Sequence, residues 1–141
     1  MKNAARLMIL ALTILPLLAA AQMTPDQKLV ANVPFDFVIG SKTVPAGEWT
    51  VQRTSSGAPV VTILNFDAKS GHLAKVSLDE ARKPADRCAL VFHKYGAQYF
   101  LASMKIEGSR VMYQLPESKA EAELRAMNQI GTEEILLAQL R

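Results

Sequence analysis

Short hydrophobic runs separated by turn residues dominate the chain between residues 31 and 115. In residues 31–39 the large apolar side chains occupy every second position, and residues 48–53 repeat this spacing around Trp49. A period of two predicts β-strands with one buried face. Pro34 has no N–H group to donate, which places the first strand at a sheet edge or at a bulge. Further strands are predicted over residues 60–66, 72–78 and 111–115.

A central β-hairpin is predicted over residues 88–106. Its two apolar runs, residues 89–92 and 99–104, are joined by six residues that include Gly96, which allows a tight reversal. The second run is apolar on both faces, so we expect it to be covered on both sides. Tyr95 lies in the predicted turn, where we expect it to be exposed.

Residues 116–141 are predicted to form a C-terminal helical segment. Ser118 and Glu121 have the spacing of a capping box, in which the serine oxygen accepts from an N–H group and the glutamate reaches back to the cap. Residues 119–127 are rich in good helix formers. A glycine then separates this helix from a second, shorter helix predicted over residues 133–140.

These elements predict a mainly β fold. We expect an antiparallel meander of about seven strands, curled into a sandwich or a partly closed barrel, with one or two C-terminal helices. The closely spaced strands favour this arrangement over a parallel α/β fold. The expected organisation is a flexible lead at residues 22–30, the β domain at residues 31–115 and the helical segment at residues 116–141.

The first 21 residues have the pattern of a secretory signal peptide. Lys2 and Arg6 precede an apolar stretch of about a dozen residues, and three alanines follow at residues 19–21, with cleavage expected before Gln22. A membrane span needs roughly 20 apolar residues, so an anchor is disfavoured. The pattern predicts export to the periplasm or the exterior, with no membrane span after cleavage.

Charge and cysteine content restrict the partners of the remaining chain. Removing Lys2 and Arg6 from the 16 basic side chains leaves 14, against 13 acidic ones. This near-neutral balance does not favour a nucleic-acid partner. Cys88 is the single cysteine, so no internal disulfide can form. We interpret it as a small core residue rather than a redox or nucleophilic group.

Four blocks of the sequence carry a resemblance to a known family. They are VPFDFVIG at residues 33–40, VPAGEWTV at residues 44–51, LVFHKYGAQYFL at residues 90–101 and LPESKAE at residues 115–121. Together they resemble a family of small secreted proteins numerous in Acidobacteria. The resemblance extends to about the first predicted helix. It implies an exported β-rich domain and brings no known activity or catalytic residues.

The residues that carry most catalytic and metal chemistry are few and scattered. The two histidines, His72 and His93, lie on different predicted strands, and no metal-binding spacing joins them to Cys88. Cys88 and His93 are expected on opposite faces of one strand, which argues against a thiol–imidazole pair. No nucleophile elbow or glycine-rich phosphate loop occurs. We therefore expect no enzyme activity, no metal and no cofactor.

Aromatic residues are the remaining candidates for contact with a ligand or partner. Trp49, Tyr95, Tyr99 and Tyr113 could line a cavity, although such residues more often belong to a core or a sheet margin.

Two hypotheses follow from the sequence. The first is an exported, non-catalytic module that binds a protein or cell-envelope partner, which is favoured because no catalytic constellation is found. The alternative is a carrier of a small apolar molecule, with a barrel cavity lined by aromatic and methionine side chains. A closed barrel with an empty interior would favour the carrier, and a filled core with an exposed apolar edge would favour the binding module.

Overall fold

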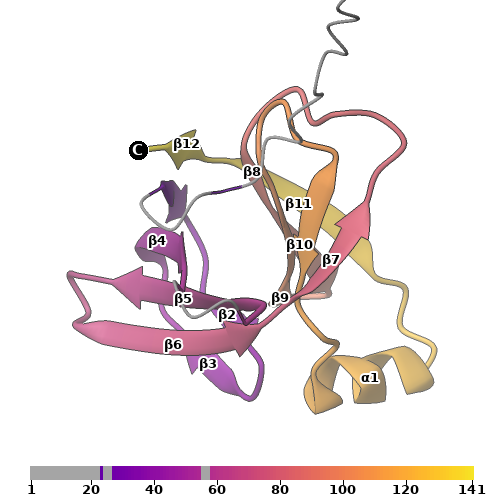
Figure 1. The fold of residues 1–141 in the computed structure, drawn as a ribbon. Helices are drawn as coiled ribbons and strands as arrows, with labels where there is room; N and C mark the ends of the chain where they lie inside the picture. Colours follow the sequence, from indigo (N-terminus) through magenta and orange to yellow (C-terminus); the bar gives the residue numbers. More distant parts are fainter. Residues whose placement is uncertain (1–22, 24–26, 55–57) are drawn as a thin grey trace, which may run out of the picture.

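The structure, a computed structural model, describes residue 23, residues 27–54 and residues 58–141. The predicted signal peptide lies outside these residues. In the described part of the chain, two β-sheets pack against each other and one short helix lies at one end of the larger sheet (Figure 1). The prediction of a mainly β fold with a C-terminal helix is confirmed, in its sandwich form rather than as a closed barrel.

The smaller sheet has five strands in the order β12-β1-β4-β5-β6, and every neighbouring pair is antiparallel. Its strands are β1 (Lys28–Val33), β4 (Gly47–Arg53), β5 (Val60–Asn65), β6 (Ser70–Lys75) and β12 (Gln139–Leu140). Buried residues alternate with half-buried ones along the whole of β5, as the period-two pattern predicts.

The larger sheet has the path β11-β8-β9-β10-β7, with β2 joined to β9 and β3 joined to β2. Its strands are β2 (Phe37–Ile39), β3 (Lys42–Val44), β7 (Ser77–Glu80), β8 (Ala89–Tyr95), β9 (Gln98–Lys105), β10 (Val111–Gln114) and β11 (Thr132–Leu137). The β8–β9 hairpin is central, as predicted, and the helix α1 (Lys119–Ala126) follows β10.

The core fills the space between the two sheets. Trp49 from the smaller sheet is fully buried, as are Phe37 and Phe92 from the larger one, and both phenylalanine rings meet at a 5.1 Å centroid separation in an edge-to-face arrangement. Each large apolar side chain buried in this way contributes roughly 1.5–3 kcal/mol. A filled interior therefore holds the sandwich together.

The first predicted strand is wrong in its extent. The chain forms β1 in the smaller sheet, passes through Pro34, and then forms β2 in the larger sheet. Val33 and Phe37 both face the core, so the alternation that predicted one strand continues across a change of sheet. The predicted flexible lead is also too long, because β1 already begins at Lys28.

The predicted strand over residues 72–78 is likewise two strands in different sheets. β6 ends at Lys75 and β7 begins at Ser77. Val76 lies between them, buried, and its N–H donates to the carbonyl of Pro59 at 2.8 Å. This corner residue belongs to the core, which is why the hydrophobic pattern runs through it.

The second C-terminal helix is a wrong prediction. Residues 132–137 form β11, which pairs with β8, and β12 then pairs with β1 in the other sheet. The last strands thus join the two sheets along one side (Figure 1). Local helix preference is a weak determinant, and pairing with two strand edges overrides it here. No helix in the described part of the chain is long and apolar enough to cross a membrane.

Candidate functional site

The larger sheet has two faces of different character. The inner face turns toward the smaller sheet and presents Leu90, Phe92 and Met104 to the core. The outer face carries the intervening residues, and the cross-strand register arranges them in rows. The first row contains Glu133 and His93. The second row is Ile135–Val91–Ser103–Gln114, and the third is Leu137–Ala89–Lys105–Met112.

Helix α1 covers only one end of the outer face (Figure 1). Its N-cap is Ser118, whose oxygen accepts the N–H of Glu121 at 3.1 Å, as the capping-box spacing predicts. The Glu121 side chain, however, contacts the sheet and not the cap. Glu121 is also the one buried residue of the helix. A carboxylate, rather than an apolar stripe, therefore holds this helix against the sheet.

The Glu121 carboxylate lies between two side chains of β8. Its Oε1 atom is 2.5 Å from Nδ1 of His93 and accepts a hydrogen bond from the Tyr95 hydroxyl at 3.3 Å. The Glu121 side chain is 6 % exposed, whereas that of His93 is 40 % exposed. A carboxylate buried to this degree requires such partners. The three side chains thus form a polar cluster that is closed on the helix side and open toward solvent at His93.

Tyr95 is buried, with 8 % exposure, which corrects the prediction that it is exposed at a hairpin tip. β8 continues through Tyr95, and the chain after α1 passes over its ring. A Cβ atom on Gly131 would lie 2.7 Å from Cε1 of this ring, so only glycine fits there without a shift. Burial, together with the negative charge of Glu121, raises the pKa of the Tyr95 hydroxyl and keeps it a hydrogen-bond donor.

A cleft of about 440 Å³ opens between α1 and the outer face. Charged side chains dominate it, and Arg125 on the helix pairs with Glu117 at 2.8 Å. The charged and titratable groups that line it are His93, Tyr95, Lys105, Glu117, Glu121, Arg125 and Glu133.

A second cavity of about 470 Å³ continues the cleft along the outer face. It shares Lys105 and Met112 with the first cavity. Its far wall is the loop between β7 and β8, which supplies Lys83 and Arg87. We call the two adjoining cavities the outer groove.

The outer groove exposes apolar side chains between its charged ends. Ile135 is 53 % exposed and Leu137 is 59 % exposed, and both lie on β11, an edge strand of the sheet. Edge strands are sites where other polypeptides readily attach, and proteins commonly protect them. Glu133 and Glu134 protect the first half of β11, while the second half carries no charge.

The four aromatic residues named from the sequence do not gather at one site. Trp49 and Tyr113 are core residues, with 0 % and 2 % exposure. Tyr99 is half-buried and stacks on Phe35 at a ring separation of 3.7 Å. Tyr95 alone lines the outer groove. Of the four aromatic candidates named from the sequence, Tyr95 is therefore the one that indicated the position of the groove.

The cysteine and the two histidines are separated. Cys88 lies in the core, where its Sγ atom accepts the N–H of Glu107 at 3.3 Å. His93 lines the groove on the outer face, so the two residues occupy opposite faces, as expected. His72 lies on β6 in the other sheet, and its ring centroid is 6.1 Å from that of Trp49. Within the described ranges, no group of three or more His, Cys, Asp or Glu side chains is placed to hold a metal ion.

Comparison with known proteins found no match among protein-family models, curated proteins or solved structures. The function must therefore be argued from the groove itself.

Sequence reasoning missed Glu121 as a site residue because its capping position already explained it. One signal was available. Residues 119–126 hold a single large apolar residue, Leu124, so a helix docked there needs some other group to face the sheet.

Proposed function

We propose that the protein is an exported, non-catalytic binding domain that contacts a protein partner through the outer groove. The observation that carries this proposal is the incomplete cover of the outer face: α1 closes one end, while Ile135 and Leu137 stay more than half exposed on an edge strand. Exposed apolar side chains set among polar ones are typical of interaction sites.

The carrier hypothesis lacks a comparable observation. Trp49 and Tyr113, which it requires around a ligand cavity, are packed in the core between the sheets. The two cavities that form the outer groove are open and combine charged groups with exposed apolar side chains, which suits a macromolecular partner better than a small apolar molecule.

Site-specific photo-cross-linking tests the location of the contact. A photoreactive amino acid replaces Ile135 in one variant and Leu73 in a control, and both proteins are irradiated in exporting cells. Leu73 is 72 % exposed on β6, so it is an apolar position on the other sheet that is more accessible than Ile135. We expect adducts from position 135 and none from position 73. Equal adducts from both positions, or none from either, would overturn the proposal.

Export is tested independently by the mass of the protein recovered from the periplasm or the medium. We expect a chain that begins at Gln22, after loss of residues 1–21. An unprocessed chain confined to the cytoplasm would contradict the exported assignment.

A further inference from the structure

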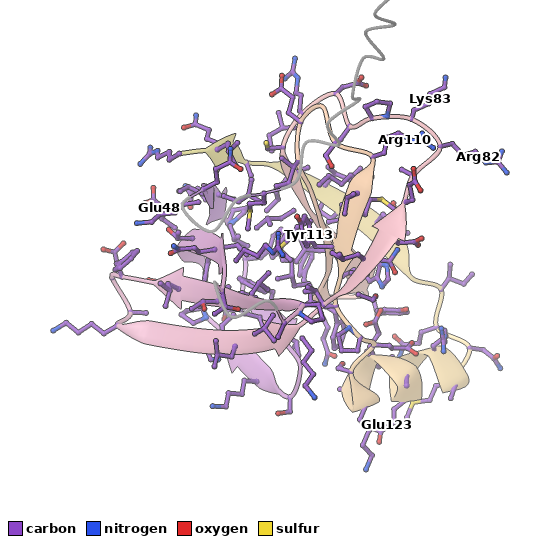
Figure 2. All side chains as sticks on the ribbon, in the orientation of Figure 1. Glu48, Arg82, Lys83, Arg110, Tyr113 and Glu123 are labelled. Carbon is purple, nitrogen blue, oxygen red and sulfur yellow. The ribbon has the colours of Figure 1, made fainter. Side chains whose placement is uncertain are left out.

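The two ends of the outer groove carry opposite charge. At the helix end, Glu117, Glu121 and Glu133 outnumber the basic residues, which are Arg125, already paired with Glu117, and Lys105, which both cavities share. At the loop end, the basic residues Lys83, Arg87 and Lys105 face a single acid, Asp86. Figure 2 shows the two bounding elements, with Glu123 on the helix and Lys83 on the loop, at opposite ends of the sheet.

The two of these charges that lie on strands of the sheet, Glu133 on β11 and Lys105 on β9, have no partner of their own. Among the described residues, neither the Glu133 carboxylate nor the Lys105 ammonium group forms a hydrogen bond or ion pair with another side chain. The other acids of the helix end are satisfied, since Glu121 contacts His93 and Glu117 contacts Arg125. Among the described residues, Lys83, Asp86 and Arg87 on the bordering loop also form no ion pair. Glu133 and Lys105 differ from them because the paired strands fix their positions, so these two residues set the charge spacing that a ligand must match.

The sheet register sets the separation of these two charges. Glu133 lies opposite His93 and Lys105 lies opposite Ala89, so four residues of β8 separate them along the strand. That is about 13 Å along the strand direction and about 10 Å across it, or about 16 Å between Cα atoms. An extended peptide covers about 13 Å between its first and fifth Cα atoms, and a lysine side chain spans the remaining distance.

We propose that the outer groove binds an extended peptide segment that carries a basic side chain and an acidic side chain four residues apart, with an apolar side chain midway between them. The proposal rests on the proposed function and specifies the partner's chemistry. Residues one, three and five of an extended segment share one face. The basic residue then faces Glu133, the acidic residue faces Lys105, and the apolar residue contacts Ile135.

The shape of the groove favours a slender occupant over a second copy of this chain. Two sheets that stack face to face approach to about 10 Å. Here α1 borders the outer face at one end and the β7–β8 loop borders it at the other (Figure 1). In a two-fold arrangement each copy would place these bordering elements against those of its partner, whereas a single extended segment fits between them.

Calorimetric titration of the full, secreted chain with defined peptides tests the proposal. The probe is acetyl-Lys-Thr-Leu-Thr-Asp-amide, and its control, acetyl-Lys-Asp-Leu-Thr-Thr-amide, has the same composition with adjacent charges. We expect the spaced peptide to bind up to about fivefold more tightly than the control, because only it reaches both charged positions.

Charge-reversal variants assign the effect to the named residues. Glu133→Lys and Lys105→Glu should each abolish this preference. The double variant should restore it, because the peptide then binds in the reverse direction. Glu134→Lys is the matched control, since Glu134 lies on the same strand opposite Phe92, on the other face, and should change nothing. Thermal melting of each variant verifies folding.

Four results would overturn the inference. Equal affinity for both peptides, or an unaltered preference in the single variants, would remove the role of charge spacing. Absence of binding to either peptide, while position 135 still cross-links, would leave the proposed function standing and exclude this partner chemistry. A concentration-dependent dimer that Glu133→Lys dissociates would make a second copy the occupant.

Discussion

The two faces of the larger sheet are built from alternate residues of the same strands, and they are completed differently. β8 presents Leu90 and Phe92 to the inner face and Val91 and His93 to the outer face. The smaller sheet covers the inner face and excludes water from it. A helix with a single buried residue, Glu121, covers part of the outer face. The inner face therefore supplies stability, and the outer face keeps polar groups and apolar edges accessible.

A β-bulge in β9 changes which of its residues lie on each face of the larger sheet. The β8–β9 register shifts between Val91 and Phe92, so that Phe92 lies opposite Leu101 while Val91 lies opposite Ser103. Ala102 is the extra residue. Bulges change the direction in which neighbouring side chains point. Beyond the bulge, Phe100 is 2 % exposed and lies opposite His93. The apolar sequence of β9 predicts that both of its faces are covered. This prediction is confirmed at the end of β9 that lies near the helix.

The largest contrast between the faces is expected from truncation of β8 side chains. Phe92→Ala should lower the free energy of unfolding by about 3–5 kcal/mol, because it leaves a cavity in a core that cannot collapse around it. Val91→Ala borders the open cleft and should cost about 1–2 kcal/mol. Urea unfolding with a constant m-value measures both. Equal losses would show that the outer face is packed as tightly as the inner one.

Glu121→Ala should cost about 1–3 kcal/mol, because it leaves His93 and Tyr95 without their partner and releases α1 from the sheet. Glu123→Ala, on the exposed side of the same helix, should change stability by less than about 0.5 kcal/mol. Hydrogen exchange across residues 119–126 is expected to accelerate only in the Glu121 variant. If both variants behaved alike, the carboxylate would not be what holds the helix.

Gly131→Ala should cost roughly 1 kcal/mol through the close approach of its Cβ to the Tyr95 ring. The same substitution made in a Tyr95→Ala background should cost much less, since the ring that it meets is gone. A double-mutant cycle of urea midpoints measures this coupling. Additive effects would mean that the segment after α1 does not rest on Tyr95.

The smallest expected effect on stability concerns His72, which has no acidic partner among the described residues, whereas His93 has Glu121. Burial and the nearby positive charge of Lys42 lower the pKa of His72 from its ordinary 6.5. Below pH 6.5 the unfolded chain binds more protons at this residue than the folded chain, so stability falls as pH decreases. His72→Gln should flatten this dependence. Urea midpoints at about pH 7.5 and 5.5 test it, and an unchanged slope would refute the assignment.

Several elements were predictable because their determinants are local. Period-two alternation located the strands around Trp49 and Ile63, and Gly96 marked the turn of the central hairpin. The cap at Ser118 was predictable because it depends on residues within one helical turn. Each of these features is set by neighbours only a few positions apart in the chain.

Other features depend on contacts between distant parts of the chain. Alternation continues through Pro34 and Val76 although the chain changes sheets there, because a buried corner residue has the same hydrophobicity as a buried strand residue. Residues 132–137 became a strand because the edge of β8 was free to pair with them. The sequence of residues 132–137 does not indicate that β8 has an edge available for pairing.

By itself, the sequence determined that this protein is a β-rich domain with a capped helix near its C-terminus, because side-chain period and capping chemistry act locally. Only the tertiary structure decided that Glu121 meets His93 and Tyr95, that Trp49 and Tyr113 belong to the core, and that Ile135 stays exposed between opposite charges. These outcomes depend on which strands pair and which face each residue occupies. That pairing is a property of the whole chain, and it places residues 28 positions apart within hydrogen-bonding distance.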